Sequence, residues 1–185
     1  MRNKLAIIVA VVVLVAVAAI WKLNKSSKQT VTTGSQPSVR VLPVSSNPIQ
    51  DSGQQTGLVI KSAAAEDNTD PVTKQAIGDR LQITLENTST QTIANVEVYY
   101  TMKDKKTGQT ESYYQKLTGF SLAPNEIRTV AFDNETMAGH YPENKYSLYR
   151  SSHNEVEFTI QVSAPGFRSA TGSAHKSAGT GETAG

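Results

Sequence analysis

The feature that most restricts the fold is a strict alternation of apolar and polar residues. It runs through residues 80–86, 95–102 and 155–164, and Leu81, Ile83 and Leu85 show it most plainly. A period of two places every second side chain on the same face of an extended chain, so each stretch is typical of a strand with one buried and one solvated face. Strands of this kind must cover their apolar faces, so the alternation predicts an all-β fold.

Shorter segments of the same character complete the predicted sheet. We expect further strands at residues 58–61, 110–117, 127–133 and 145–149, separated by turn sequences at 104–108, 123–125 and 164–166. No sustained helical period follows Trp21. About seven short strands in about 110 residues is the size of a single immunoglobulin-like antiparallel β-sandwich, which we assign to residues 57–168.

A different kind of segment precedes this domain. Leu5–Trp21 is a run of 17 residues with no polar or charged side chain, flanked by Lys4 and Lys22. As a helix it measures roughly 25 Å, near the lower limit for crossing a bilayer, so residues 1–25 are predicted to form an N-terminal transmembrane anchor. The alternative is a signal segment cleaved after Ala18, because Ala16-Val17-Ala18 fits an A-x-A site.

Two low-complexity segments flank the predicted sandwich. Residues 26–56 hold eleven Ser/Thr, five Gln, three Pro and two Gly, a composition typical of a flexible linker, although residues 39–44 could add an edge strand. Residues 169–185 consist almost entirely of Gly, Ala, Ser and Thr. We predict that this tail is disordered.

Charge and composition exclude several classes of protein. Residues 1–56 carry six Lys/Arg against one acid, whereas residues 57–168 carry eleven against fourteen. The basic excess therefore belongs to the anchor and linker, and no nucleic-acid partner is expected. Outside the apolar run, only 52 of the 164 residues from 22 onward are apolar, which argues against an enzyme with a large core. The absence of cysteine removes disulfides and thiolate chemistry.

Residues 81–133 resemble a known family. An alternating strand ends in Asn87-Thr88-Ser89, a V-x-V strand follows at Val96, and the stretch ends in the corner Leu122-Ala-Pro-Asn-Glu126. This order resembles the FxLYD and CARDB-like immunoglobulin-type domains of prokaryotic cell-surface proteins. The resemblance implies a binding or spacer module without catalytic residues. Asn125 stands where the family pattern has glycine, and asparagine tolerates the positive φ that such a corner needs.

The tyrosines offer one possible recognition surface. All seven lie between residues 99 and 149. Exposed tyrosine with asparagine and histidine suits contact with a protein or glycan partner. The alternative is ordinary cross-strand packing, in which tyrosine simply favours sheet. The residues of the predicted surface are Tyr99, Tyr113, Tyr114, His140, Tyr141, Asn144, Tyr146 and Tyr149.

No catalytic, cofactor or metal site is predicted. The three histidines, His140, His153 and His175, are scattered without acids at the spacing of a zinc site. The acidic loop at residues 66–70 lacks the Gly and Glu of an EF-hand, so we interpret it as a solvated loop.

These observations favour a single-pass membrane protein that presents one non-catalytic interaction or structural domain at the cell surface, outside the cytoplasm. Two alternatives stay open. The chain could be a secreted or periplasmic carbohydrate- or peptide-binding module released by cleavage, or an accessory subunit of a membrane enzyme or transporter.

Overall fold

The computed structural model describes residues 41–50, 53–68, 70, 72–74 and 79–179. These residues belong to one compact unit, Val39–Gly185. The predicted anchor Leu5–Trp21, the cleavage site after Ala18 and the first part of the linker lie outside them. Within the described part of the chain, none of the helical structure has the length and apolarity that a membrane crossing requires.

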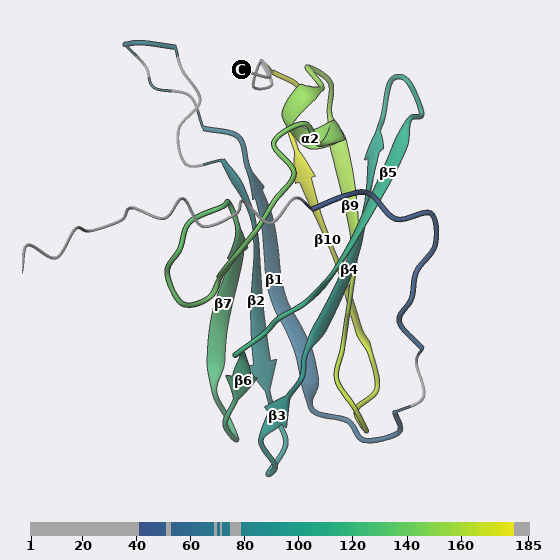
Figure 1. Ribbon diagram of the computed structural model, residues 1–185, viewed down its shortest axis with the longest axis vertical. Helices are drawn as coiled ribbons and strands as arrows, with labels where there is room; N and C mark the ends of the chain where they lie inside the picture. Colours follow the sequence, from purple (N-terminus) through teal and green to yellow (C-terminus); the bar gives the residue numbers. More distant parts are fainter. Residues whose placement is uncertain (1–40, 51–52, 69, 71, 75–78, 180–185) are drawn as a thin grey trace, which may run out of the picture. The chain divides into compact units, whose positions relative to one another are not determined.

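Two four-stranded sheets form a β-sandwich (Figure 1). The first has the order β1-β2-β7-β8, where β1 pairs with β2 and β2 with β7 in antiparallel fashion. The short β8 joins β7 in parallel, so the sheet is not purely antiparallel as predicted. The bounds of its strands are β1 Leu58–Glu66, β2 Arg80–Asn87, β7 Ile127–Phe132 and β8 His140–Tyr141.

The second sheet is antiparallel throughout and has the order β10-β9-β4-β5. Its strands are β4 Glu97–Asp104, β5 Thr110–Lys116, β9 Val156–Ser163 and β10 Ala170–Lys176. A two-stranded ribbon and one helical turn complete the unit: β3 Ile93–Ala94, β6 Ser121–Leu122 and α2 Leu148–Ser151.

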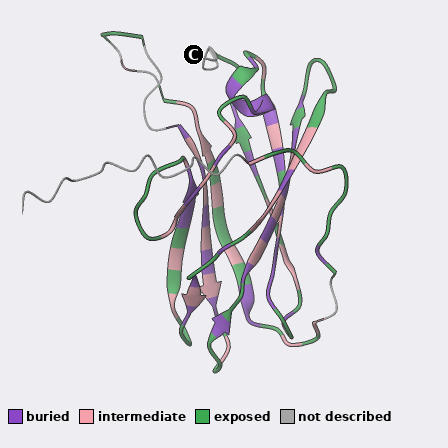
Figure 2. Cartoon of the chain, viewed as in Figure 1, coloured by how far each residue is buried: buried purple, intermediate pink, exposed green. Residues whose placement is uncertain are grey.

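The core lies between the sheets and follows the alternation of the sequence (Figure 2). Leu81, Ile83 and Leu85 of β2 are at most 1% exposed, while the residues between them are half-buried. An aromatic cluster fills the centre: the ring of Tyr100 lies 5.5 Å from those of Tyr113 and Phe132. In β2 the period of two therefore identified both the strand and the face that it buries.

Two turns on which the family resemblance rests, residues 87–89 after β2 and residues 122–126 before β7, meet at one buried side chain. Asn87 is fully buried, and its Nδ2 donates to the carbonyls of Gln91, Leu122 and Ala123 at 2.7, 3.0 and 3.0 Å. Its Oδ1 accepts from the backbone N–H of Ser89 at 2.9 Å. Asn87 thus joins the turn after β2 to the corner before β7. At that corner Asn125 has a φ of 62°, as expected from its place in the pattern.

The prediction of a disordered tail is wrong for Ala170–Lys176. This segment forms β10 and pairs with β9 along its whole length. The small residues of β10 let it approach β1 closely, because a Cβ on Gly172 would lie 3.0 Å from Cγ2 of Ile60 in β1. Lys176 is buried at the end of the strand, where Nζ donates to the carbonyl of Ser152 and lies 3.6 Å from Oδ2 of Asp67. A buried, paired cation holds the strand in place.

Two further predictions need correction. Residues 145–149 do not form a strand, because Leu148 and Tyr149 are consecutive residues that are both buried, and the one-turn helix α2 allows this. The end of the predicted linker is also part of the folded unit. The backbone N–H of Val44 donates to the carbonyl of Ser112 at 2.8 Å, and Gln55 forms a bridge with Phe167.

Candidate functional site

The structure divides the predicted tyrosine surface between the core and the outside. Tyr113 and Tyr149 are at most 1% exposed, and Tyr141 is 9% exposed. Burial raises the pKa of all three phenols, so they stay neutral in the physiological range. These three side chains pack in the core and offer almost no surface to a partner, so their inclusion in the predicted surface is wrong.

Tyr99 and Tyr114 lie on the opposite, outward face. They are directly paired across β4 and β5. Tyr100 and Tyr113 form the next pair along the two strands, and their side chains face the core. Because successive residues of a strand point to opposite faces, each Tyr-Tyr dipeptide contributes one ring to the core and one to the outside. Both outer tyrosines are half-buried. Desolvation, reinforced by a hydrogen bond to Glu97, raises the pKa of Tyr114 to about 12.

Polar side chains surround this pair on the outer face of the β10-β9-β4-β5 sheet. Thr101 Oγ1 donates to the hydroxyl of Tyr99 at 3.2 Å and lies 2.9 Å from Oγ of Ser112. At one side of the face, Asn47 Nδ2 donates to Oε1 of Gln161 at 2.7 Å, so the segment before the domain reaches this face. The result is a polar surface on which two aromatic rings lie side by side across β4 and the edge strand β5. We call it the tyrosine face, defined by Tyr99, Thr101, Ser112, Tyr114 and Gln161.

The other predicted site residues lie near α2. Asn144 is half-buried and donates from Nδ2 to the hydroxyl of Tyr113 at 2.8 Å, so it serves the fold. Tyr146 is 58% exposed. Beneath this loop Arg150 is buried and pairs with Glu143 at 2.6 Å and with Asp79 at 3.5 Å. The loop is therefore held by a buried ion network, and it does not extend the tyrosine face.

His140 lies in a cluster that the sequence analysis missed. Its Nδ1 lies 2.8 Å from Oδ2 of Asp133 and 3.7 Å from Oε2 of Glu135. The donor atoms of the three residues all lie within 4.8 Å of one another. The spacing D-x-E-x₄-H was the available signal. It is an uncommon ligand pattern, and only the parallel pairing of β7 with β8 brings its two ends together.

The acidic loop at residues 66–70 is engaged in protein contacts. Glu66 pairs with Arg80 at 2.9 Å, and Asp67 lies beside the buried Lys176. The carboxylate of Asp70 accepts from the backbone N–H groups of Val72 and Thr73, and these hydrogen bonds lower its pKa. These carboxylates are used to hold neighbouring segments together.

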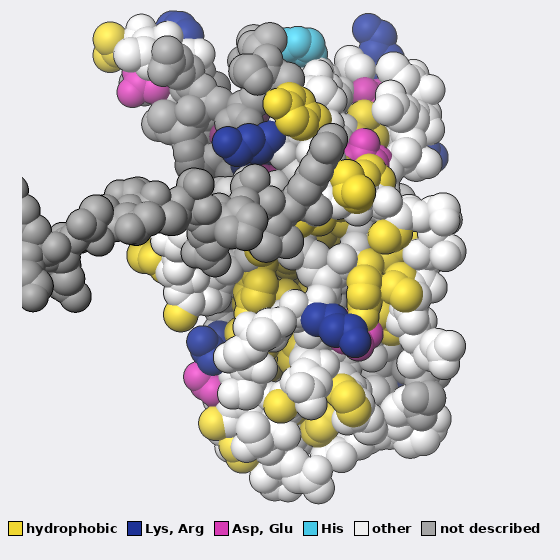
Figure 3. Space-filling view, viewed as in Figure 1, with side chains coloured by type: hydrophobic (Ala, Val, Ile, Leu, Met, Phe, Trp, Pro, Cys, Tyr) yellow, Lys and Arg dark blue, Asp and Glu magenta, His cyan; other side chains and the backbone are white. Residues whose placement is uncertain are grey.

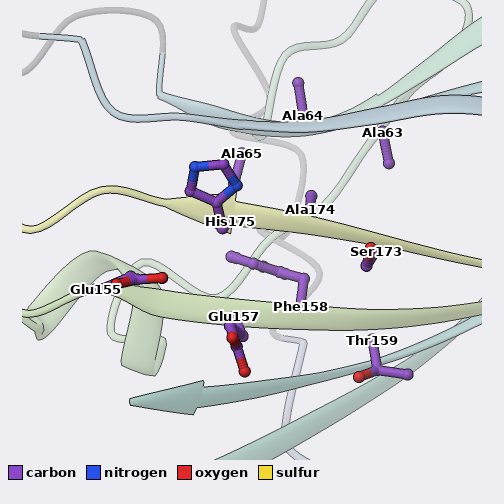
Figure 4. Close-up of a pocket in the computed structure, with 10 residues that line it drawn as sticks. All are labelled: Ala63, Ala64, Ala65, Glu155, Glu157, Phe158, Thr159, Ser173, Ala174 and His175. Atoms are coloured by element: carbon purple, nitrogen blue, oxygen red, sulfur yellow. The ribbon is translucent and has the colours of Figure 1, made fainter. Parts of the chain in front are cut away.

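A hollow of about 620 Å³ lies between β1 and β10, which are edge strands of different sheets (Figure 4). On the β1 side it is lined by residues 63–65, and Glu157 and His175 line the other side. Small side chains on both strands leave this space. On the face drawn in Figure 3, basic and acidic side chains occur close to one another in small groups.

The sequence matches no family model and no curated protein. Among solved structures, the chain is similar to the archaellum periplasmic stator protein FlaG from Sulfolobus acidocaldarius, with 18% identity and a TM-score of 0.35 over 64% of this chain and 99% of that one. It is also similar to the complex of FlaF and FlaG from the same organism, with 20% identity and a TM-score of 0.36 over 70% of this chain and 99% of that one.

A third similar structure is β-glucuronidase 2 of Bacteroides uniformis, with 11% identity and a TM-score of 0.34. The match covers 71% of this chain but only 14% of the glucuronidase. All three TM-scores are below 0.5, so these likenesses do not bear on what this chain binds or does. The resemblance of residues 81–133 to FxLYD and CARDB-like domains stays a prediction.

Proposed function

We propose that the chain is a single-pass membrane protein whose β-sandwich lies outside the cytoplasm and acts by non-catalytic contact with a protein partner. The apolar run Leu5–Trp21 and the Ser/Thr-rich linker after it support the anchor and the stalk. The order of the seven long strands supports an immunoglobulin-like sandwich: the first, second and fifth lie in one sheet and the other four in its partner.

The observation that carries the proposal is the paired tyrosines of the tyrosine face. Tyr99 and Tyr114 are adjacent on an otherwise polar surface, and neither fills the core. Tyrosine is enriched at protein interfaces because it buries a large ring at little conformational cost and keeps a polar group for a hydrogen bond. Interfaces of this kind depend on a few central aromatic residues.

The position of the preceding segment agrees with this use. Val44 bonds to the edge of β5 and Asn47 bonds to Gln161 on the face itself. Residues 44–47 of the predicted linker thus lie beside the tyrosine face. A partner bound there would contact the sandwich and these residues together.

A pull-down from solubilised membranes tests the proposal. The full chain carrying Tyr99→Ser and Tyr114→Ser should lose its partner, because aromatic residues that anchor an interface each contribute about 2 kcal/mol or more. The control is Tyr146→Ser, which removes a tyrosine that is 58% exposed but lies away from the face. Retention of the partner by the double variant, with the thermal midpoint unchanged, would exclude the tyrosine face as the interface.

The alternative of a released module rests on Ala16-Val17-Ala18. Mass spectrometry of the mature N-terminus distinguishes the anchored chain from the released module. A chain that keeps residues 1–18 agrees with the anchor, whereas a chain that begins at Ala19 supports the secreted module.

A further inference from the structure

We propose that Asp133, Glu135 and His140 form a binding site for a divalent transition-metal ion, of which Zn²⁺ is the natural probe. The cluster lies where β7 ends and β8 begins, at the two ends of a short loop. It is independent of the tyrosine face and of the proposed partner.

The spacing of the donor atoms suits one ion. Metal–nitrogen and metal–oxygen bonds of about 2.0–2.2 Å in a tetrahedral site place neighbouring ligand atoms about 3.3 Å apart. Nδ1 of His140 lies 2.8 and 3.7 Å from the nearest oxygens of Asp133 and Glu135, on either side of that value. Small side-chain rotations therefore bring all three atoms to bonding distance of one centre.

The backbone holds two of the three ligands in place before an ion arrives. The parallel pairing of Ala131 with His140 sets the position of the imidazole, and the backbone N–H of Ala131 donates to the carbonyl of Gly139 at 2.9 Å. The carboxylate of Asp133 is only 5% exposed and accepts from the backbone N–H of Glu135 at 3.0 Å. Preorganised ligands lose little freedom on binding.

Solvent reaches the site from one side. A cavity of about 380 Å³ is lined by Asp133 and Glu135, and the side chain of Glu135 is 48% exposed. Water or another small ligand can therefore complete the coordination shell, which three protein donors leave open. Three cations also line this cavity: Lys145, Arg80, which pairs with Glu66, and Arg150, which pairs with Glu143 and Asp79.

The donor set selects the class of ion. Two carboxylates and a neutral imidazole balance a charge of +2. Imidazole suits Zn²⁺ and its neighbours in the first transition row, whereas Ca²⁺ and Mg²⁺ prefer oxygen donors alone. The site should therefore discriminate between these two groups of cations.

Calorimetric titration of the full, tag-free chain in detergent tests the inference. We expect Zn²⁺ to bind with one-to-one stoichiometry and to raise the thermal midpoint, and Ca²⁺ and Mg²⁺ to do neither at the same concentration. Glu135→Gln, at an exposed position where the fold should tolerate it, should weaken Zn²⁺ binding at least about tenfold, and His140→Ala should do so more strongly.

His175→Ala is the matched control, since His175 is exposed on β10 and lies outside the cluster. It should leave Zn²⁺ affinity unchanged. Absence of Zn²⁺ binding by the unaltered chain would overturn the proposal. So would binding that survives both Glu135→Gln and His140→Ala, because the ion would then occupy another site.

Discussion

Asn87→Asp tests whether one buried amide joins the turn after β2 to the corner before β7. The substitution preserves the shape of the side chain but replaces the Nδ2 donor by an oxygen. That oxygen would face the carbonyls of Gln91, Leu122 and Ala123, to which Nδ2 now donates at 2.7, 3.0 and 3.0 Å. The hydrogen bond that Oδ1 accepts from Ser89 would remain.

The expected loss depends on pH. Three lost hydrogen bonds at about 1 kcal/mol each remove about 3 kcal/mol, and an ionised carboxylate buried against carbonyl oxygens adds a desolvation penalty of about 2 kcal/mol or more. At neutral pH the variant should therefore lose about 5 kcal/mol, which is comparable to the whole stability of a small domain. In its protonated form the new carboxyl can donate to one carbonyl, so the loss falls to about 2 kcal/mol.

The direction of the pH dependence follows from proton linkage. The site favours the protonated acid, so the pKa of the introduced carboxyl in the folded state is raised above about 4, its value in the unfolded chain. The folded state then holds a proton that the unfolded state releases, so stability relative to the unaltered chain falls as pH rises from about 4 toward that raised pKa.

Urea denaturation followed by circular dichroism, at pH 4 and pH 7, measures both quantities. Asn47→Asp is the control, because Asn47 is exposed and its Nδ2 bonds only to Gln161. It should change the free energy of unfolding by no more than about 0.5 kcal/mol. An Asn87→Asp variant as stable as the unaltered chain, or one whose loss is the same at both pH values, would refute the reasoning.

Three further predictions concern other parts of the fold. Hydrogen bonds from Asn154, Ser152 and the backbone N–H of Thr107 hold the pKa of Asp104 well below its ordinary value. Asp104→Asn should therefore lower the thermal midpoint at pH 7. The difference in thermal midpoint between the variant and the unaltered chain should shrink as pH falls below about 4. A Cβ on residue 53 would lie 1.8 Å from the carbonyl oxygen of Phe167, so Gly53→Ala should release residues 53–56 and cost about 1–3 kcal/mol in urea denaturation. An unchanged free energy of unfolding would contradict the packing of Gly53 against Phe167. Truncation after residue 168 removes β10 and should lower the free energy of unfolding by on the order of 5 kcal/mol. Truncation after residue 179 keeps every described contact of β10 and should leave that free energy almost unchanged. Equal stability of the two truncated chains would contradict the pairing of β10 with β9.

The sequence predicted those strands whose buried residues are large. In β2, β4 and β9 the alternate buried residues are large apolar side chains as far as Leu85, Met102 and Val162, and each strand lies where the alternation placed it. The turns could be predicted equally well from the sequence, because Asn125 and Gly166 have the positive φ that their turn sequences indicate. Their signals are local, so no tertiary information was needed.

Strands built from small residues could not be recognised in the same way. The prediction ended β1 at Lys61, but a register shift between Ile60 and Ser62 changes which residues face inward, and alanines continue the strand to Glu66. In β10 only Ala174 and Lys176 are buried. Such a strand is specified by the neighbours that it must fit, and no periodicity of its own reports them.

The candidate sites show the same limit. Each Tyr-Tyr dipeptide exposes one ring because successive strand residues point to opposite faces, and the structure identifies the outer rings as Tyr99 and Tyr114. The cluster of Asp133, Glu135 and His140 was not predicted, because it depends on the parallel pairing of β8 with β7. A two-residue strand leaves no detectable pattern in a sequence.

Site-specific photo-crosslinking in intact cells tests the central claim most directly. A photoreactive phenylalanine analogue would replace Tyr114 on the tyrosine face or, as the control, Gln82 on the outer face of the other sheet, where the residue is also half-buried. The proposed interface predicts one discrete protein adduct from position 114 and none from position 82. No adduct from position 114, or the same adduct from both positions, would contradict the assignment of the tyrosine face as the surface through which this protein acts.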